Sequence, residues 1–443
     1  MINKTKNILG VILFALGIFF NPLFLEKVSS PQAFIGFKYK LPIEAISISL
    51  ILIGVILLVI KLDPKSIKKL AEFYKMTAIT LLSTLILFTL SNLICLTWYG
   101  IKDLMFYKNF IAAKYKTPLE NLYPGFTKKE INQILDESWM RPYVYEPYTQ
   151  FKERAFNGKY VNVHKSGFRH VKEQGPWPPD KNNFNIFVFG GSTFFNYGLP
   201  DYQTIPSYLQ EFFNQKEKDS HLPPPTSHLC IYNFCQGYYF SSQECILLKK
   251  LITSGFIPNA ALFIDGLNEF YQVNDEPFFT ERLRNYFKGK QGFVLNIPIV
   301  RLISESKTRK ANDVIDINNY KFNPLEIDTI INRYFVNKKI TESICKDFNI
   351  KSYFIWQPIP TYKYDLNYHP FADGGFGKHS LSRYGYQEME KYFKAGILGN
   401  NFLWLADMQE GIDKSLYLDK YHYTAEMSKE IAEKIYKWLK DKF

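Results

Sequence analysis

Three long apolar runs near the N-terminus limit what this chain can fold into more than any other feature. Residues 7–25, 42–61 and 76–100 are almost entirely apolar, and about 20 such residues cross the hydrocarbon core of a bilayer as a helix. The third run ends in Trp98 and Tyr99, residues typical of a membrane interface. A cleaved signal peptide is the alternative for the first run, but no small-x-small cleavage site follows it. We therefore predict a membrane region over residues 1–101 with three transmembrane helices.

The distribution of lysine predicts how these helices are oriented. Residues 1–99 carry ten lysines against four acidic residues, a surplus of six that makes up half of the net charge of +12. The loop Lys61–Lys75 alone holds five lysines. Because positively charged loops stay on the cytoplasmic side, we expect this loop and the N-terminus to be cytoplasmic. Three crossings then place the rest of the chain outside the cytoplasm, in the periplasm or at the cell surface.

The remaining charge and the cysteines exclude several classes of function. The positive charge after residue 101 forms no Lys/Arg block and no nucleic-acid-binding motif, so we expect no nucleic-acid partner. Five cysteines occur without a C-x-x-C spacing, which excludes a zinc ribbon or a thioredoxin-type motif and dictates no disulfide pairing.

The part after the membrane region changes its pattern near residue 183. Residues 102–182 are rich in Tyr, Pro and charge, and we interpret them as a connector and a lid or edge element. From there on, short apolar runs alternate with amphipathic helices. This pattern indicates a parallel sheet covered on both faces, a three-layer α/β/α domain over residues 183–443. The five predicted strands are contained in "NIFVFG", "HLCIYNFC", "NAALFIDG", "FNIKSYFIWQP" and "NNFLWLADM".

Polar residues at the ends of these predicted strands suggest a chemistry. Ser192 lies in "GGST", Gly237 in "CQGYY" and Asn268 in "GLNE", while Asp419 and His422 lie in "DKYH" near the C-terminus. Alone, each of the first four is explained by a turn or a helix cap, and His422 by a solvated or hydrogen-bonded histidine. Together they offer what serine hydrolysis needs, because a serine nucleophile requires a histidine base, an acid that orients it, and donors for the oxyanion.

In these four motifs and their order, the predicted α/β domain resembles the SGNH (GDSL-type) hydrolases. The resemblance implies a flavodoxin-like, doubly wound fold without a cofactor or a catalytic metal. It implies that Ser192 is the nucleophile, His422 the general base and Asp419 the acid that orients the base. The backbone amides of Ser192 and Gly237 and the side-chain amide of Asn268 would form the oxyanion hole.

Three positions depart from the family pattern. Gly191 replaces the Asp that usually precedes the nucleophile, and Glu269 replaces the Asp that usually follows the motif asparagine. In the second motif, counting from Asn233 places the usual family glycine at Tyr238, one residue after Gly237. The amide of either residue could serve the oxyanion hole.

These residues leave three functions open. The first is an esterase acting on an acyl ester of a lipid or of an envelope carbohydrate. The second is an O-acyltransferase of the same fold that passes the acyl group to a glycan. The third is a membrane-anchored binding module without activity. We expect the partners to be the acyl-ester substrate and the lipid bilayer.

Two further stretches invite a functional interpretation. His369, Asp373 and His379 lie close together in "YHPFADGGFGKH" and could suggest a metal, but the Gly- and Pro-rich sequence favours a mobile loop over the site. Trp356 and Gln357 follow the fourth predicted strand, where they either line a pocket or pack in the core.

Overall fold

The computed structural model describes most of the chain, and these residues form two compact units, Met1–Ile94 and Cys95–Phe443. The described residues are 2–22, 37–60, 63–114, 119–219, 228–287, 298–299, 302, 323–372 and 375–442.

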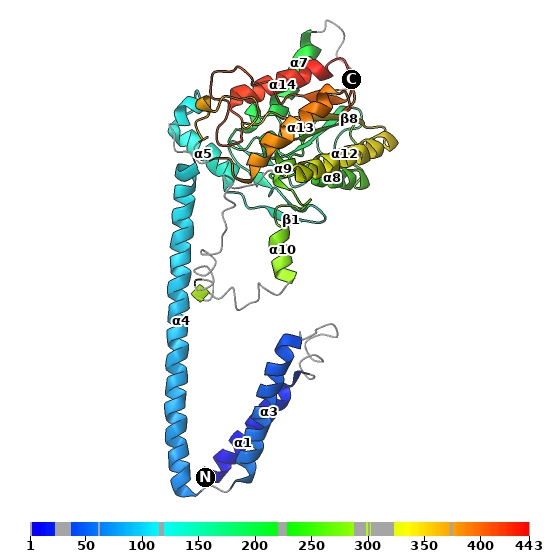
Figure 1. Cartoon of the computed structure of the whole chain (residues 1–443). Helices are drawn as coiled ribbons and strands as arrows, with labels where there is room; N and C mark the ends of the chain where they lie inside the picture. The colour runs from blue at the N-terminus through cyan, green and yellow to red at the C-terminus, as the bar shows by residue number, and fades with distance from the viewer. Residues whose placement is uncertain are drawn as a thin grey trace. The chain divides into compact units, whose positions relative to one another are not determined.

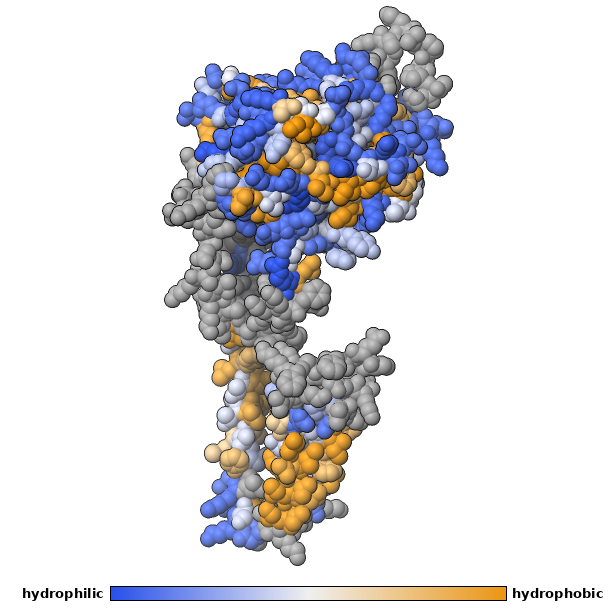
Figure 2. Space-filling model, turned by 45° about the vertical axis from the view of Figure 1, so that its right-hand side comes forward, coloured by the Kyte–Doolittle hydropathy of each residue, from blue (hydrophilic) through white to orange (hydrophobic). Residues whose placement is uncertain are grey.

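Two helices at the N-terminal end are long and apolar enough to cross a membrane. They are α3 (Phe37–Val59), which covers residues 42–59 of the second predicted span, and α4 (Pro64–Lys114), which contains the third. The helix α1 (Ile2–Phe19) is shorter in its apolar part, and residues 23–25 of the first predicted span lie outside the described residues. Much of the predicted basic loop is helical, because α4 already begins at Pro64 and Lys and Glu are good helix formers. Figure 2 shows a broad apolar surface on these N-terminal helices.

Small residues bring α1 and α3 into close contact. A Cβ atom added to Gly54 would lie 2.8 Å from the carbonyl oxygen of Gly10, and one added to Gly17 would lie 2.9 Å from the carbonyl oxygen of Ser47. The hydroxyl of Ser47 also donates to the carbonyl of Gly17 at 2.8 Å. Small residues and hydroxyl donors are the usual means by which apolar helices associate in a membrane, where the hydrophobic effect gives no driving force.

The larger unit is built on one sheet of five parallel strands in the order β6-β5-β7-β8-β9. Helices surround this sheet in Figure 1. Numbered along the chain, this is the order 2-1-3-4-5 of a flavodoxin-like doubly wound sheet, so the predicted fold class is confirmed. Four of these strands fall within their predicted runs, while β5 begins at Phe184, one residue before its run. The strands are β5 (Phe184–Gly190), β6 (Leu229–Asn233), β7 (Ala260–Asp265), β8 (Lys351–Trp356) and β9 (Phe402–Trp404).

Helices cover both faces of this sheet, as the alternation of side chains on its strands requires. On β5, Ile186 and Val188 point into one hydrophobic core, while Phe187 and Phe189 point into the other. The first core is closed by α7 (Ile205–Asp219) and α14 (Ala425–Leu439). The second is closed by α8 (Ser241–Thr253), α12 (Pro324–Asp347) and α13 (Ser382–Lys394).

Residues 119–182, predicted to be a connector or lid, pack against the sheet domain as part of the same unit. They contain one α-helix, α5 (Lys128–Trp139), whose start is fixed by a capping box between Thr127 and Glu130. Short strands follow it in two antiparallel pairs. These are β1 (Val144–Glu146) with β2 (Gln150–Lys152), and β3 (Phe156–Asn157) with β4 (Asn162–Val163).

Arg169 ties this segment to the turn that follows β5. Its side chain is completely buried and donates to the backbone carbonyls of Phe195 and Asn196 at 2.6 and 2.8 Å. Its Nε also pairs with Asp201 at 2.8 Å. Because a buried guanidinium is stable only when its donors are satisfied, this contact fixes the segment and the turn to each other.

Candidate active site

Ser192 stands on a tight turn at the carboxyl end of β5. Gly191 is in an extended conformation, and the short helix α6 (Ser192–Phe195) begins directly after it. The helix is ended by Asn196, whose φ of 61° is left-handed and whose Oδ1 accepts the amide of Ile205 at 2.9 Å. Ser192 itself is half-buried.

Asp419 and His422 meet Ser192 from a loop near the C-terminus. The Nδ1 atom of His422 lies 2.8 Å from both carboxylate oxygens of Asp419, and its Nε2 lies 2.9 Å from Oγ of Ser192. The same carboxylate accepts the amides of Tyr421 and His422 at 2.8 and 2.9 Å. Asp419 is 2% exposed and His422 5% exposed, so both are held inside the protein.

These contacts determine which ring nitrogen of His422 carries the proton. A carboxylate only accepts hydrogen bonds, so Nδ1 of His422 carries the proton and Nε2 is left to accept from the hydroxyl of Ser192. A base in this tautomer can take the proton of an attacking serine, and the buried carboxylate of Asp419 stabilises the imidazolium that results.

Asn268 lies beside the Ser192 turn, at the start of α9 (Leu267–Tyr271), which follows β7. Its Nδ2 donates to the carbonyl of Tyr239 at 2.7 Å, and an amide nitrogen has a second hydrogen to donate. A Cβ atom added to Gly191 would lie only 2.4 Å from this nitrogen. In this chain the absence of a Cβ on Gly191 leaves room for the amide of Asn268 beside the turn.

The loop after β6 brings in Gly237 and Tyr238, the two candidates for the second backbone donor. The amide of Gly237 donates to Oε1 of Glu153 at 3.3 Å. Tyr238 has a φ of 62°, in the left-handed region that favours glycine, which is the family residue expected at this position. Its amide donates to no other group in the described part of the chain. The geometry thus favours Tyr238 over Gly237 as an oxyanion donor.

Glu153, in the segment before the sheet domain, organises this loop and was not found from the sequence. It is 1% exposed and pairs with Arg141 at 2.9 Å. Its carboxylate also accepts the hydroxyl of Tyr197, and its amide donates to Gln236 at 2.7 Å. A buried carboxylate that holds the loop in this way needs its neutralising arginine.

Two aromatic rings flank the imidazole and were likewise missed. Trp139 meets His422 edge to face with 5.2 Å between ring centroids, and Tyr197 lies 5.8 Å from the same ring. Trp139 and Tyr197 also contact each other at 4.6 Å. The sequence carried no signal for these contacts, because an aromatic residue at the end of a helix is usually explained by packing.

Buried carboxyl groups lie behind Asn268, on the side of the sheet covered by α8. Burial, together with the neighbouring Asp265 and Glu269, raises the pKa of Glu244 well above its ordinary value. Burial and Glu269 raise the pKa of Asp265 in the same way. Glu269, the residue that replaces the family Asp, accepts from Ser241 and pairs with Arg333 at 3.2 Å. It therefore anchors α9 rather than taking part in the site.

Both histidines of the stretch interpreted as a mobile loop contact tyrosine rings. The ring of His379 contacts those of Tyr271 and Tyr421 at tilted angles, with 4.6 and 4.4 Å between centroids. Burial lowers its pKa to about 3, so the ring is neutral at pH 7. His369 stacks on Tyr417 at 5.0 Å, while Asp373 lies outside the described residues.

Trp356 and Gln357 pack in the interior, one of the two outcomes considered for them. Trp356 is fully buried in the second core, and Gln357 is 2% exposed. The side chain of Gln357 accepts the hydroxyl of Thr193 at 2.5 Å and that of Tyr423 at 3.1 Å. Gln357 therefore connects the Ser192 turn to the loop that carries His422.

No known family profile and no curated protein sequence matches this chain. Solved structures similar to it include a putative lipolytic protein of the G-D-S-L family from Desulfitobacterium hafniense, at 10% identity and a TM-score of 0.30, covering 58% of this chain and 100% of that one. A psychrotrophic esterase from Pseudoalteromonas has 11% identity and a TM-score of 0.29, covering 58% and 98%. A lipolytic G-D-S-L protein from Veillonella parvula has 9% identity and a TM-score of 0.30, covering 57% and 96%. Because these scores are low, we derive the function from the site itself.

Proposed function

We propose that this protein is a membrane-anchored serine esterase of the SGNH type, which cleaves an acyl ester outside the cytoplasm. The observation that carries the proposal is the chain of hydrogen bonds from Asp419 through His422 to Ser192. The position of Ser192 after β5, beside the first residues after β7, also supports the proposal. The strand order reverses between β5 and β7, and ligands of doubly wound sheets bind at such a point.

In the proposed reaction, Oγ of Ser192 attacks the ester carbonyl while Nε2 of His422 takes its proton. The oxyanion of the tetrahedral intermediate accepts from the amides of Ser192 and Tyr238 and from Nδ2 of Asn268. The C–O bond to the alcohol then breaks, and His422 returns the proton to the leaving alcohol. Water, deprotonated by His422, attacks the acyl-serine in the same manner and releases the acid.

The same residues would serve an O-acyltransferase, in which a glycan hydroxyl replaces water in the second half of the reaction. In an inactive binding module, these residues would catalyse no reaction. A serine that reacts as a nucleophile would distinguish both enzymes from the binding module. Acyl transfer to an added acceptor would distinguish the two enzymes from each other.

We further infer that the chain crosses the membrane three times, with the N-terminus in the cytoplasm. The apolar character of α3 and α4 supports two crossings, and the apolar part of α1 supports the third. The five lysines of residues 61–75 support the orientation. In this proposal residues 1–101 form the membrane region, residues 102–182 an accessory segment, and residues 183–443 the catalytic domain.

The full chain in detergent, treated with a fluorophosphonate probe, tests the proposed nucleophile. We expect one labelled residue, Ser192, with no labelling in Ser192→Ala and labelling slowed by orders of magnitude in His422→Ala. Asp419→Asn should retain more activity on p-nitrophenyl acetate than either variant, because Asp419 orients the base without taking the proton.

Ser242→Ala is the matched control, since this serine is half-buried at the start of α8, like Ser192 at the start of α6, and donates to Asp275. It should label like the wild type. Labelling that persisted in Ser192→Ala, or ester hydrolysis by that variant at the wild-type rate, would refute the mechanism. A rise in acyl transfer to an added glycan, at the expense of hydrolysis, would favour the acyltransferase.

A further inference from the structure

Two neighbouring backbone amides in the loop after β6, those of Gly237 and Tyr238, are candidates for the second oxyanion donor. The amide of Gly237 donates to Oε1 of Glu153 at 3.3 Å, whereas that of Tyr238 donates to no group among the residues that the structure describes. A backbone amide has one hydrogen to donate, so an amide that is bound to a carboxylate is not free to stabilise an oxyanion. The group that holds Gly237 therefore determines which amide of the loop serves the substrate.

The carboxylate of Glu153 is bound through both of its oxygens. Nη1 of Arg141 lies 2.9 Å from Oε2, and Oε1 accepts the hydroxyl of Tyr197 as well as the amide of Gly237. The backbone of Glu153 is bound to the same loop, because its amide donates to Oε1 of Gln236 at 2.7 Å. A buried carboxylate with all of these partners is fixed in one position, and it fixes the amide that it accepts.

Arg141, the cation of this pair, is itself fixed to the C-terminal end of α5. Its Nε donates to the carbonyl of Glu137 at 2.7 Å and its Nη2 to that of Ser138 at 3.2 Å, which satisfies carbonyls that a helix end leaves without intrahelical partners. Trp139, the last residue of the same helix, contacts the ring of His422. The end of α5 thus packs against the base directly and supports the oxyanion loop through Arg141 and its carboxylate partner.

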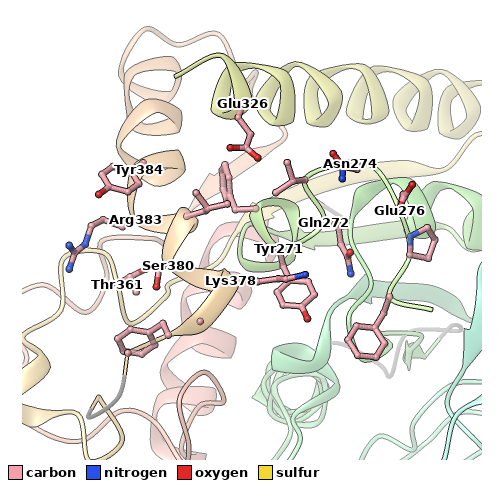
Figure 3. Close-up of a pocket in the computed structure, with 18 of the residues that line it drawn as sticks. Tyr271, Gln272, Asn274, Glu276, Glu326, Thr361, Lys378, Ser380, Arg383 and Tyr384 are labelled. Carbon is pink, nitrogen blue, oxygen red and sulfur yellow. The ribbon is translucent and has the colours of Figure 1, made fainter. Parts of the chain in front are cut away.

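The ring of Tyr238 is fixed by a second set of contacts. It stacks on Phe278 with 4.1 Å between centroids and contacts Tyr271 at 5.8 Å. Both partners line a cavity of about 750 Å³, where Figure 3 labels Tyr271. Tyr238 has a φ of 62°, and a residue other than glycine keeps such a conformation only where its surroundings impose it. The aromatic contacts fix the ring, but only a hold on Gly237 fixes the peptide that carries the amide of Tyr238.

The salt bridge between Glu153 and Arg141 also settles the electrostatics of this loop. A negative charge close to an oxyanion opposes its formation, most strongly inside a protein, where the effective dielectric constant is low. The guanidinium lies 2.9 Å from the carboxylate and cancels this charge. Glu153 can therefore accept from the loop without opposing the charge that develops on the substrate.

We propose that Glu153 is a positioning residue of the oxyanion hole, which takes the amide of Gly237 and thereby leaves that of Tyr238 to bind the oxyanion. This inference rests on the proposed function and adds a residue to its site. Glu153 acts through the loop rather than by contact with the substrate, and Arg141 fixes it and neutralises its charge. The accessory segment before the sheet domain therefore contributes to turnover as well as to folding.

The test compares two variants that differ only in the acceptor at position 153. In Arg141→Met/Glu153→Gln the side-chain oxygen can still accept from Gly237, whereas in Arg141→Met/Glu153→Leu no acceptor remains. Neither variant leaves a buried charge without a partner, which is the costly change at such a pair. Rates of p-nitrophenyl acetate hydrolysis by the full chain in detergent are divided by the final amount of fluorophosphonate label, which counts the active molecules.

We expect kcat with Glu153→Leu to be about a hundredfold below that with Glu153→Gln, and KM to differ by less than about twofold, because a displaced donor stabilises the transition state less. The thiono analogue of the substrate, in which sulfur replaces the carbonyl oxygen, gives a second readout, since sulfur is a weak hydrogen-bond acceptor and depends less on the oxyanion hole. The ratio of kcat/KM between the oxygen ester and the sulfur ester should fall about tenfold with Glu153→Leu. A protein that is merely less stable would keep this ratio.

Glu137→Gln is the matched control for a change at a buried carboxylate of the same segment. Glu137 is 9% exposed and accepts the backbone amides of residues 159–161, the shortest contact being 2.7 Å to Tyr160. It should lower the melting temperature and leave both kcat per labelled molecule and the ester ratio within about twofold of the wild type.

Hydrogen exchange in a Ser192→Ala background measures the hold of Glu153 on the loop without any catalysis. Mass spectrometry of the peptide around Gly237 should show its amide exchanging about tenfold faster with Glu153→Leu than with Glu153→Gln, both combined with Arg141→Met. This difference, together with a wild type that hydrolyses no ester, would refute the enzyme and keep Glu153 as the group that holds the loop.

Two results would overturn the role of Glu153 while the esterase stands. One is Ser192-dependent hydrolysis with the same kcat and the same ester ratio in both variants. The other is an amide of Gly237 that exchanges equally fast in both, which would show that another group holds the loop.

Discussion

At the scale of single residues, the candidate site depends on how closely groups from separate strands approach one another. Gly191 and Gly237 both lack a Cβ where another side chain takes the space. A Cβ on Gly237 would lie 2.0 Å from the hydroxyl of Tyr143, just as one on Gly191 would meet the amide of Asn268. These glycines are needed for close approach, whereas Tyr238 adopts a backbone conformation that favours glycine without being one.

Asn268→Ala tests the oxyanion hole. Removing a donor aimed at a developing oxyanion costs about 3 to 4 kcal/mol, so we expect turnover to fall at least about a hundredfold. The melting temperature should fall much less than this loss of activity would suggest. An asparagine used only as a cap would give the opposite result, a less stable protein with normal turnover per folded molecule.

Gly191→Ala should impair the same donor indirectly. The new methyl group would lie 2.4 Å from Nδ2 of Asn268 and force that side chain to turn away. We expect turnover to fall about tenfold or more, and the double variant Gly191→Ala/Asn268→Ala to be no slower than Asn268→Ala alone. Additive losses in this cycle would show that Gly191 acts through some other contact.

At the scale of elements, the sequence predicted the strands, but it did not predict several contacts that complete the candidate site. Five apolar runs bounded by turn residues predicted the five strands, since buried parallel strands have this local pattern. The motifs at their ends then led to Ser192 and His422. Glu153 and Trp139 could not be found in this way, because each acts through a contact between distant segments that leaves no periodicity in either one.

The helix α8 carries a carboxyl group whose burial predicts a dependence of stability on pH. Burial, Asp265 and Glu269 raise the pKa of Glu244 above its value in the unfolded chain, so the folded protein keeps a proton that the unfolded chain loses above roughly pH 4.5. This group therefore makes the protein less stable as the pH rises from there. The neutral variant Glu244→Gln removes this effect.

We expect the melting temperature of Glu244→Gln to exceed that of the wild type by an amount that grows between about pH 5 and pH 8. Differential scanning fluorimetry on the two proteins in parallel measures this difference. A difference that stayed constant or shrank with rising pH would mean that the carboxyl of Glu244 is ionised in the folded protein.

At the scale of the whole molecule, the membrane region determines which compartment the proposed enzyme serves. Alkaline phosphatase, which is active only outside the cytoplasm, should be active when fused after Lys114 and inactive when fused after Ile60. The prediction rests on the lysines between α3 and the apolar part of α4. Inactive phosphatase after Lys114 would place the α/β unit in the cytoplasm and exclude an envelope substrate.

The buried guanidinium of Arg169 has a consequence for protein engineering. The sheet domain alone, excised at residue 183, would lose the donors that satisfy the carbonyls of Phe195 and Asn196 and the partner of Asp201. It would also lose Glu153 and its hold on Gly237. A soluble fragment intended for crystallisation or screening should therefore begin before η1 (Leu119–Leu122), because the segment ahead of the sheet is a structural part of this unit and cannot be exchanged as a linker.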